Sequence, residues 1–274
     1  MKARFFGPSR HVRVGVGTGI GKAIRVTSIK KAQGGRGETI RIVIHALLIA
    51  LVIRTFLFQP FNIPSGSMKA TLLIGDYLFV SKFSYGYSHF SLPFSPPLFS
   101  GRFFGSDPAR GDVVVFRPPK KEDTDFIKRV IGLPGDRIQM KDGRLFINDV
   151  EVRRERLSDF VGPNPCASFL FPGRVKRWKE TLDNGVSYET LDCEDNGKYD
   201  NTNVFTVPPG HFFMMGDNRD NSDDSRDSVG YVPRENLIGR AQVIFFSVDE
   251  GESAWTFWRW PISVRWGRLF NIVR

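Results

Sequence analysis

The chain has 274 residues, of which 41% are hydrophobic and 25% are charged, and its formal net charge is +10. This length allows one large domain or two modest ones, and the hydrophobic share excludes both wholesale disorder and a membrane protein with many spans. The charge is uneven, because residues 1–41 contain ten Lys or Arg and one acid, Glu38. The remainder is almost neutral, which argues against a nucleic-acid-binding domain, although the basic tail alone could contact anionic lipid or RNA. Residues 1–35 are also rich in Gly, and we expect them to be mostly flexible.

A long apolar segment follows the basic tail. Residues 42–53 (IVIHALLIALVI) carry no formal charge, and the apolar character continues past Arg54 to Phe58. As a helix, residues 42–58 would be about 26 Å long, slightly shorter than a hydrocarbon core of about 30 Å. A buried core helix or the apolar part of a cleaved signal peptide would have the same composition. The preceding positive charges favour a single transmembrane anchor with a cytoplasmic N-terminus.

Beyond the apolar segment, short apolar runs alternate with Gly, Pro and Asp, which is typical of β-strands joined by turns. Residues 140–152 (MKDGRLFINDVEV) predict a hairpin with a turn at Asp142-Gly143. Residues 160–205 show little periodicity and are interpreted as an irregular insertion or a small second lobe. No long amphipathic helix is expected between residues 70 and 250, so the soluble part is predicted to be mostly β.

The C-terminal segment AWTFWRWPISVRWGRLFNIVR contains four of the five Trp, together with Arg259, Arg265 and Arg268. Trp and Arg together suit the headgroup region of a bilayer, so this segment is predicted to contact the membrane surface. An ordinary C-terminal core segment is the alternative.

Several common catalytic and metal-binding motifs are missing from the sequence. It has no HExxH, no paired CxxC and no GxSxG, and its four His are scattered. The acidic run at residues 217–227 lacks the glycine and glutamate of a calcium loop and is interpreted as a structural turn. Cys166 and Cys193 lack zinc-site spacing, and whether they form a disulfide stays open. No metal or cofactor is therefore predicted.

Ser67, in the sequence IPSGSM at residues 63–68, is the candidate nucleophile. Pro64 fixes one dihedral angle and Gly66 permits a tight turn, so Ser67 could be displayed on a constrained loop. A serine hydroxyl is a poor nucleophile unless a base takes its proton. Without a suitable histidine, the base that remains is a lysine.

Lys128 is the candidate base, because it lies in the apolar sequence DFIKRVI. In a strand it would emerge between Phe126 and Val130, where desolvation disfavours the ammonium form. Lowering its pKa from ~10.4 to about 8 requires ~3 kcal/mol, which buried lysines reach. Taken alone, the same pattern also fits an edge lysine whose amine reaches solvent.

The blocks IPSGSM, TLLIGDYLFV, GDVVVF, DFIKRVIGLPGD and GDNRDNSDDSR occur in this order. Together they strongly resemble the type I signal peptidases (leader peptidases) of bacteria, over about residues 40–250. The combination of residues 65–68 with the Lys-Arg pair and residues 216–226 makes the resemblance specific. It implies a Ser-Lys endopeptidase with a mostly β, signal-peptidase-like catalytic domain and a smaller inserted lobe.

The resemblance also implies roles for individual residues. Ser67 corresponds to the nucleophile of the family and Lys128 to its general base. The oxyanion hole would combine the backbone N–H of Ser67 with the hydroxyl of Ser65, which meets the need for donors aimed at the developing charge. Ser222 corresponds to the serine that orients the lysine amine.

Further positions follow from the same match. Asp224 and Arg226 correspond to a structural ion pair beneath the site. Ala70 departs from the proline usual in the family, which affects the rigidity of the turn and removes no reacting group. The residues assigned to the pocket for small P1 and P3 side chains are Phe61, Ile63, Met68, Leu72, Phe126 and Ile127.

The expected organisation has five parts along the chain. They are a basic cytoplasmic tail (1–38), a transmembrane anchor (39–59), a catalytic β core (60–141 and 206–250), an inserted lobe (142–205) and a membrane-surface segment (251–274). Some relatives carry two spans, whereas only one is found here.

The predicted function is removal of N-terminal signal peptides from exported preproteins at the bacterial inner membrane. The catalytic domain would lie on the periplasmic face, the lipid bilayer would be a partner, and nothing in the sequence demands nucleic acid or a dimer. One alternative is a Ser-Lys peptidase of the self-cleaving repressor type, but such proteins carry a DNA-binding helical domain. The other is a membrane-anchored binding protein without catalysis, which would make the contexts of Ser67 and Lys128 coincidental.

Overall fold

The computed structural model describes residues 36–274 apart from residues 164 and 167–173. The basic tail predicted over residues 1–38 lies almost entirely outside this range. The prediction that residues 1–35 are flexible also concerns residues outside it. Helix α1 spans Arg36–Phe56, and Gly37–Phe56 has a mean hydropathy of 2.0. Its side chains from residue 37 to residue 56 are exposed except for Thr55, unlike those of a buried core helix. The helix is therefore long and apolar enough for one membrane span.

The rest of the described chain is mostly β, as predicted. Besides α1, the described residues contain one further α-helix, the short α2 (Trp260–Ser263). Short 3₁₀ turns join several of the strands. The strands are β1 (Phe58–Asn62), β2 (Asp76–Ser81), β3 (Val113–Phe116), β4 (Phe126–Gly132), β5 (Arg137–Lys141), β6 (Arg144–Ile147), β7 (Val150–Glu151), β8 (Arg153–Arg156), β9 (Phe160–Val161), β10 (Arg174–Thr181), β11 (Ser187–Asp192), β12 (Phe205–Thr206), β13 (His211–Met215), β14 (Val232–Pro233) and β15 (Leu237–Ser247).

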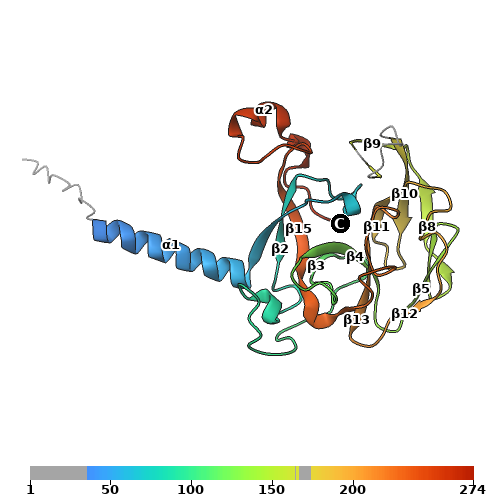
Figure 1. Ribbon diagram of the computed structural model, residues 1–274, viewed down its shortest axis with the longest axis horizontal. Coiled ribbons are helices and arrows are strands. Elements are labelled where there is room, and N and C mark those ends of the chain that lie inside the picture. The colour runs from blue at the N-terminus through green and yellow to red at the C-terminus, as the bar shows by residue number, and fades with distance from the viewer. Residues whose placement is uncertain (1–35, 164, 167–173) are drawn as a thin grey trace, which may run out of the picture. The chain divides into compact units, whose positions relative to one another are not determined.

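A seven-stranded antiparallel sheet in the order β1-β2-β15-β3-β4-β13-β14 forms the core (Figure 1). Val113 and Val115 of β3 pack into one apolar cluster, and Val114 and Phe116 pack into another. Successive side chains of a strand point to opposite faces, so both faces of the sheet are covered here. This explains the uninterrupted apolar sequence of β3.

Two smaller sheets form a second region beside the core sheet (Figure 1). The predicted hairpin is present as β5 and β6, and Asp142 and Gly143 at its turn have φ values of 46° and 68°. Because β5 pairs with β6 and β12, the smaller sheets begin at Arg137, before the predicted boundary at residue 142. A backbone bridge between Leu191 and Asn218 joins β11 to the chain after β13.

The structure pairs Cys166 with Cys193 in a disulfide, with Cα atoms 5.8 Å apart. Cys193 follows β11, and its backbone N–H donates to Asp220 Oδ2 at 2.7 Å. The disulfide joins Cys166, which follows β9, to Cys193, and the hydrogen bond to Asp220 connects Cys193 to the acidic run at residues 217–227.

The C-terminal segment has both exposed and buried parts. Its apolar side chains that are at least half exposed are Trp255, Phe257, Trp258, Ile262, Trp266, Phe270 and Ile272. Arg265 and Arg268 were expected to contact lipid headgroups together with the tryptophans. In the structure both pair instead with the fully buried Asp76. An unpaired buried carboxylate is costly, so these two arginines attach the segment to β2.

Candidate active site

Ser67 lies in a 3₁₀ turn, Gly66–Met68, shortly after β1, and its residue surface is 8% exposed. Asn218 holds this turn from the other side of the site. The Asn218 backbone N–H donates to Ser67 O at 3.1 Å, and Asn218 Nδ2 donates to Gly66 O at 3.1 Å. A side chain at Gly216 would collide with Ser67 O and with Ser222, so glycine is required for this close approach.

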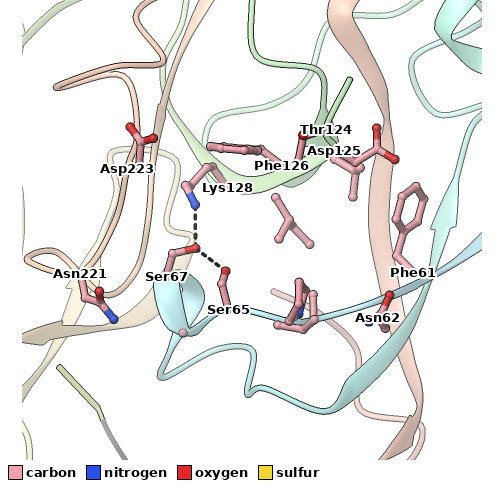
Figure 2. Close-up of a pocket in the computed structure, with 15 residues that line it drawn as sticks. Phe61, Asn62, Ser65, Ser67, Thr124, Asp125, Phe126, Lys128, Asn221 and Asp223 are labelled. Atoms are coloured by element: carbon pink, nitrogen blue, oxygen red, sulfur yellow. Dashed lines mark hydrogen bonds between the residues drawn. The ribbon is translucent and has the colours of Figure 1, made fainter. Parts of the chain in front are cut away.

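Lys128 lies in β4, the strand that its sequence predicted, and pairs there with Val114 of β3. It is 4% exposed, and its Nζ donates to Ser67 Oγ at 2.6 Å (Figure 2). The Nζ also lies 5.4 Å from the centre of the Phe126 ring. The alternative of an edge lysine that reaches solvent is therefore wrong in this structure.

The surroundings of Lys128 disfavour its charged form. Burial lowers the pKa of Lys128 to about 8, although the negative charges of Asp224, Asp223 and Asp217 oppose this change. Near neutral pH a useful fraction of the amine is consequently uncharged. Such an amine can accept the proton of a hydroxyl that lies within hydrogen-bond reach.

A cavity of about 380 Å³ opens beside the two side chains. Its walls come from the end of β1, the segment that follows it and the start of β4, and Phe61 and Phe126 line it (Figure 2). The pocket residues Ile63 and Ile127 line it as well. Such a groove between two extended segments can hold an extended peptide, because each segment offers backbone groups to it. Lining residues that the sequence did not single out as site residues are Asn62, Pro64, Gly66, Val115, Thr124, Asp125, Asn221 and Asp223.

Met68 and Leu72, also predicted at the pocket, are not among the residues that line this cavity. Both are fully buried in the apolar cluster that contains Ile63. The structure therefore places Met68 and Leu72 in the same core cluster as the wall residue Ile63, and not in the lining of this cavity.

The remaining predicted residues surround the Ser67–Lys128 contact. Ser65 Oγ lies 3.5 Å from Ser67 Oγ, on the side of the cavity (Figure 2). Asp224 and Arg226 form a buried ion pair at 2.9 Å. Burial raises the pKa of Asp224, but Arg226 and two backbone N–H donors outweigh this and hold it below its usual value. Ser222 Oγ is buried without a hydrogen-bond partner among the described residues, and its orienting role stays a prediction.

A second buried ion pair lies directly beside Lys128 and was not predicted. Arg129 donates to Asp217 through Nε at 2.8 Å and through Nη2 at 2.7 Å, and both residues are almost inaccessible to solvent. Thr71 Oγ1 also donates to Asp217 Oδ2, at 2.5 Å. The Lys-Arg pair and the acidic run were visible in the sequence, but their pairing depends on the contact between β4 and β13.

Among the described residues, no group of three or more His, Cys, Asp or Glu is placed to hold a metal ion.

Comparison with known proteins identifies the family of this chain. The family model described as signal peptidase, peptidase S26, matches residues 36–246. The chain belongs to the signal peptidase family. Signal peptidase I of Rickettsia typhi is 47% identical over 247 residues, which cover 82% of this chain and 89% of the relative. Signal peptidase I of Rickettsia massiliae is 45% identical over 250 residues, which cover 83% and 90%.

A solved structure of a signal peptidase I from Enterococcus faecalis is 26% identical and covers 49% of this chain and 97% of its own, with a TM-score of 0.29. The family model and the two relatives show that this chain is a signal peptidase enzyme. They favour this function over a self-cleaving repressor or a binding protein without catalysis.

Proposed function

We propose that this signal peptidase is a membrane-anchored serine endopeptidase in which Ser67 is the nucleophile and Lys128 the general base. The observation that supports this most directly is the 2.6 Å contact between Lys128 Nζ and Ser67 Oγ. The substrates would be preproteins, from which the enzyme removes the N-terminal signal peptide.

In the proposed reaction, neutral Lys128 takes the hydroxyl proton while Ser67 Oγ bonds to the carbonyl carbon of the scissile peptide bond. The carbonyl electron pair moves to oxygen, where the Ser67 N–H and the Ser65 hydroxyl stabilise the charge. Lys128 then gives its proton to the leaving amine as the C–N bond breaks, which leaves an ester on Ser67. Water then loses a proton to Lys128 as its oxygen bonds to the ester carbon. Lys128 returns this proton to Ser67 Oγ as the C–O bond breaks, which releases the signal peptide and restores both side chains.

The cavity supports selection of small side chains next to the scissile bond. Phe61, Ile63 and Ile127 belong to one packed apolar cluster, so these walls cannot withdraw without disturbing the core. Larger substrate side chains would have to displace them, which costs about 1–3 kcal/mol in a well-packed site.

We assign residues 39–59 as the anchor, residues 60–136 and 207–250 as the catalytic core and residues 137–206, which contain the smaller sheets, as the inserted lobe. Residues 1–38 would be cytoplasmic and residues 251–274 would contact the membrane surface. The exposed aromatic side chains of Trp255, Phe257, Trp258 and Trp266 support this contact. An anchored enzyme meets a membrane-bound signal peptide at a higher local concentration than a free one does.

The catalytic assignment is tested by cleavage of a preprotein with the purified full chain in detergent. Ser67→Ala and Lys128→Ala should each lower kcat by about 10³-fold or more, because each removes a member of one reacting unit. Matched controls are Ser100→Ala and Lys179→Ala, which change exposed residues and should leave the rate unchanged. Normal processing by Ser67→Ala would refute the assignment of the nucleophile.

Orientation is tested separately with a reporter fused after residue 250. Alkaline phosphatase, which is active only outside the cytoplasm, should be active there. Activity of a cytoplasmic reporter at the same position would contradict the proposed topology.

A further inference from the structure

A second cavity, of about 150 Å³, lies beside the last turn of α1. Four charged side chains line it, Arg54, Lys82, Arg117 and Asp125, and we call it the cationic cavity. Arg54 lies in the last turn of α1, and the Lys82 backbone N–H donates to Leu57 O at 2.9 Å, just beyond that turn. The cavity is thus built where the apolar helix ends and β2 ends.

Lys82 is the most unusual residue of the cationic cavity. It is only 3% exposed, yet its Nζ donates to the backbone oxygen of Ser91 at 2.6 Å, and it forms no salt bridge among the described residues. An ammonium group has three donors and no acceptor. Two N–H groups of Lys82 therefore remain for an acceptor, and a buried ammonium without a carboxylate partner is costly.

The other charged residues do not neutralise Lys82. Arg117 pairs with Asp125, which uses the single carboxylate that lines the cavity, and Arg54 contributes another positive charge. Burial and the charge of Arg54 lower the pKa of Lys82 to about 8, although Asp125 opposes this change. Three cationic side chains thus face one acid, so an anion would offset the unfavourable charge.

The position of the cavity indicates where the anion comes from. An arginine at the end of an apolar membrane helix extends to the headgroup level of the bilayer. Phe58 and Phe83 directly adjoin the lining residues Gln59 and Lys82 in the sequence, both are exposed, and their rings lie 5.4 Å apart. A phospholipid of the surrounding bilayer could therefore reach the cavity. Its phosphate would lie at the level of Arg54, and its acyl chains would remain in the hydrocarbon core.

We propose that the cationic cavity binds the phosphate of an anionic phospholipid, with Arg54 and Lys82 as its main ligands. The arginine would donate through its guanidinium fork and the lysine through its two remaining N–H groups. This inference rests on the proposed membrane anchor, since it assumes that α1 ends at the headgroups.

The test is a titration of the full chain in detergent micelles with a fluorescent phosphatidylglycerol, read as the affinity expressed in mole fraction. Arg54→Gln and Lys82→Met should each weaken binding about fivefold, because one cation near a lipid surface contributes roughly that much. Arg137→Gln is the matched control, since Arg137 is exposed and lies in the smaller sheets, and it should bind as the wild type does. Arg54 is also exposed, so its replacement keeps the test valid if Lys82→Met fails to fold.

Further measurements distinguish a lipid phosphate from free phosphate, and a failure of the lipid site from a failure of the proposed anchor. Inorganic phosphate should compete only at millimolar concentration, and phosphatidylcholine should bind more weakly than phosphatidylglycerol. Equal binding of phosphatidylglycerol by wild type and Arg54→Gln, or full competition by micromolar phosphate, would overturn the lipid site. Release of the chain from membranes by alkaline carbonate would instead refute the anchor, so the two failures are distinguishable.

Discussion

The chemistry proposed for the site depends on how one lysine is surrounded. Lys128 emerges from a strand whose neighbours are apolar, and its amine contacts Ser67 Oγ instead of a carboxylate. Three aspartates lie close enough to influence it, but the one with the largest influence, Asp224, is already paired with Arg226. Burial consequently outweighs attraction, and the amine loses its proton close to the pH at which it must act.

The first prediction concerns pH. Since the pKa of Lys128 is lowered to about 8 and the neutral amine is the active form, kcat/KM should rise about tenfold per pH unit below pH 8 and level off above it. Cleavage of a preprotein between pH 6 and pH 10 measures this profile. A rate that stays constant down to pH 6 would mean that no group of this pKa acts as the base.

The second prediction concerns stability. Below pH 8 the folded protein holds a buried ammonium, whereas the unfolded chain holds a solvated one with a pKa near 10.5, which costs the folded state about 3 kcal/mol. Lys128→Met should therefore be inactive yet more stable than wild type at pH 7, by up to that amount. Because the unfolded chain binds more protons between pH 8 and pH 10.5, the wild type should gain stability with pH there and the difference should shrink.

Denaturant unfolding of both proteins at pH 7 and pH 10 measures this effect. Lys179→Met, at an exposed position, is the control and should change the free energy of unfolding by less than about 0.5 kcal/mol. A Lys128→Met protein that is less stable than wild type at pH 7 would contradict the cost assigned to the buried amine.

At the residue scale, the sequence could identify candidate residues whose signal lies in the neighbouring sequence. Ser67 and Lys128 could be named because one follows a Pro-Ser-Gly turn and the other interrupts an apolar strand. Asn218 could not be named, because its role depends on contacts with Ser67 and Gly66, which lie far away in the sequence. The pairing of Arg265 and Arg268 with Asp76 was missed for the same reason.

At the scale of elements, the contact between β4 and β13 brings the two halves of the site together. Arg129 of β4 and Asp217, just after β13, form a buried bidentate pair, and Arg129 Nη1 also donates to Gly111 O at 2.7 Å. The backbone that precedes Asn218 is thereby fixed relative to the strand that carries Lys128. The geometry of the Ser67–Lys128 contact thus depends on the Arg129–Asp217 pair, the joint between β4 and the chain after β13.

The third prediction tests this joint. Asp217→Asn leaves the charge of Arg129 buried without a counter-charge, so it should lower the free energy of unfolding by about 3 kcal/mol or more. Denaturant unfolding in detergent measures the loss. Asp149→Asn, which breaks the exposed pair with Arg137, should change it by less than about 1 kcal/mol. Equal effects of the two substitutions would show that the buried pair does not stabilise the fold.

The strands of the core sheet were largely predictable from alternating or continuous apolar runs. The paired strands β10 and β11 were missed, because they lie in residues 160–205, where the sequence shows little periodicity. The hairpin of β5 and β6 was found because Asp-Gly is a strong turn signal. The order of the core sheet was not predictable, because β15 lies between β2 and β3, which precede it by more than a hundred residues. Local periodicity carries no information about which distant strand becomes a neighbour.

At the scale of the whole molecule, the backbone bridge between Leu191 and Asn218 ties the smaller sheets to the core, and the disulfide closes a loop within the smaller region. Cys166 and Cys193 are 27 residues apart in the sequence, and Asp220 accepts a hydrogen bond from the Cys193 N–H. The sequence left this pairing open, because two cysteines alone do not show that they are neighbours. A disulfide also fits the oxidising periplasm in which the catalytic domain is proposed to lie.

The fourth prediction follows from the length of the disulfide loop. Closing a loop of this length restricts the unfolded chain and stabilises the fold by roughly 3.5 kcal/mol. Cys193→Ala should lose about this amount in denaturant unfolding, and reduction of the wild type should have the same effect. An alkylation shift that appears without reductant would show that the two thiols are free and would contradict the pairing.

The central claim is that the amine of Lys128 is uncharged when it meets Ser67. Its pKa can be measured on the full chain in detergent by NMR titration of ¹³Cε-labelled lysines, with Lys128→Arg and Lys82→Met used to assign the two lysines of lowered pKa. We predict that one signal titrates near pH 8 and is missing only from Lys128→Arg. A Lys128 signal that titrates near its ordinary value of about 10.4 would contradict the mechanism.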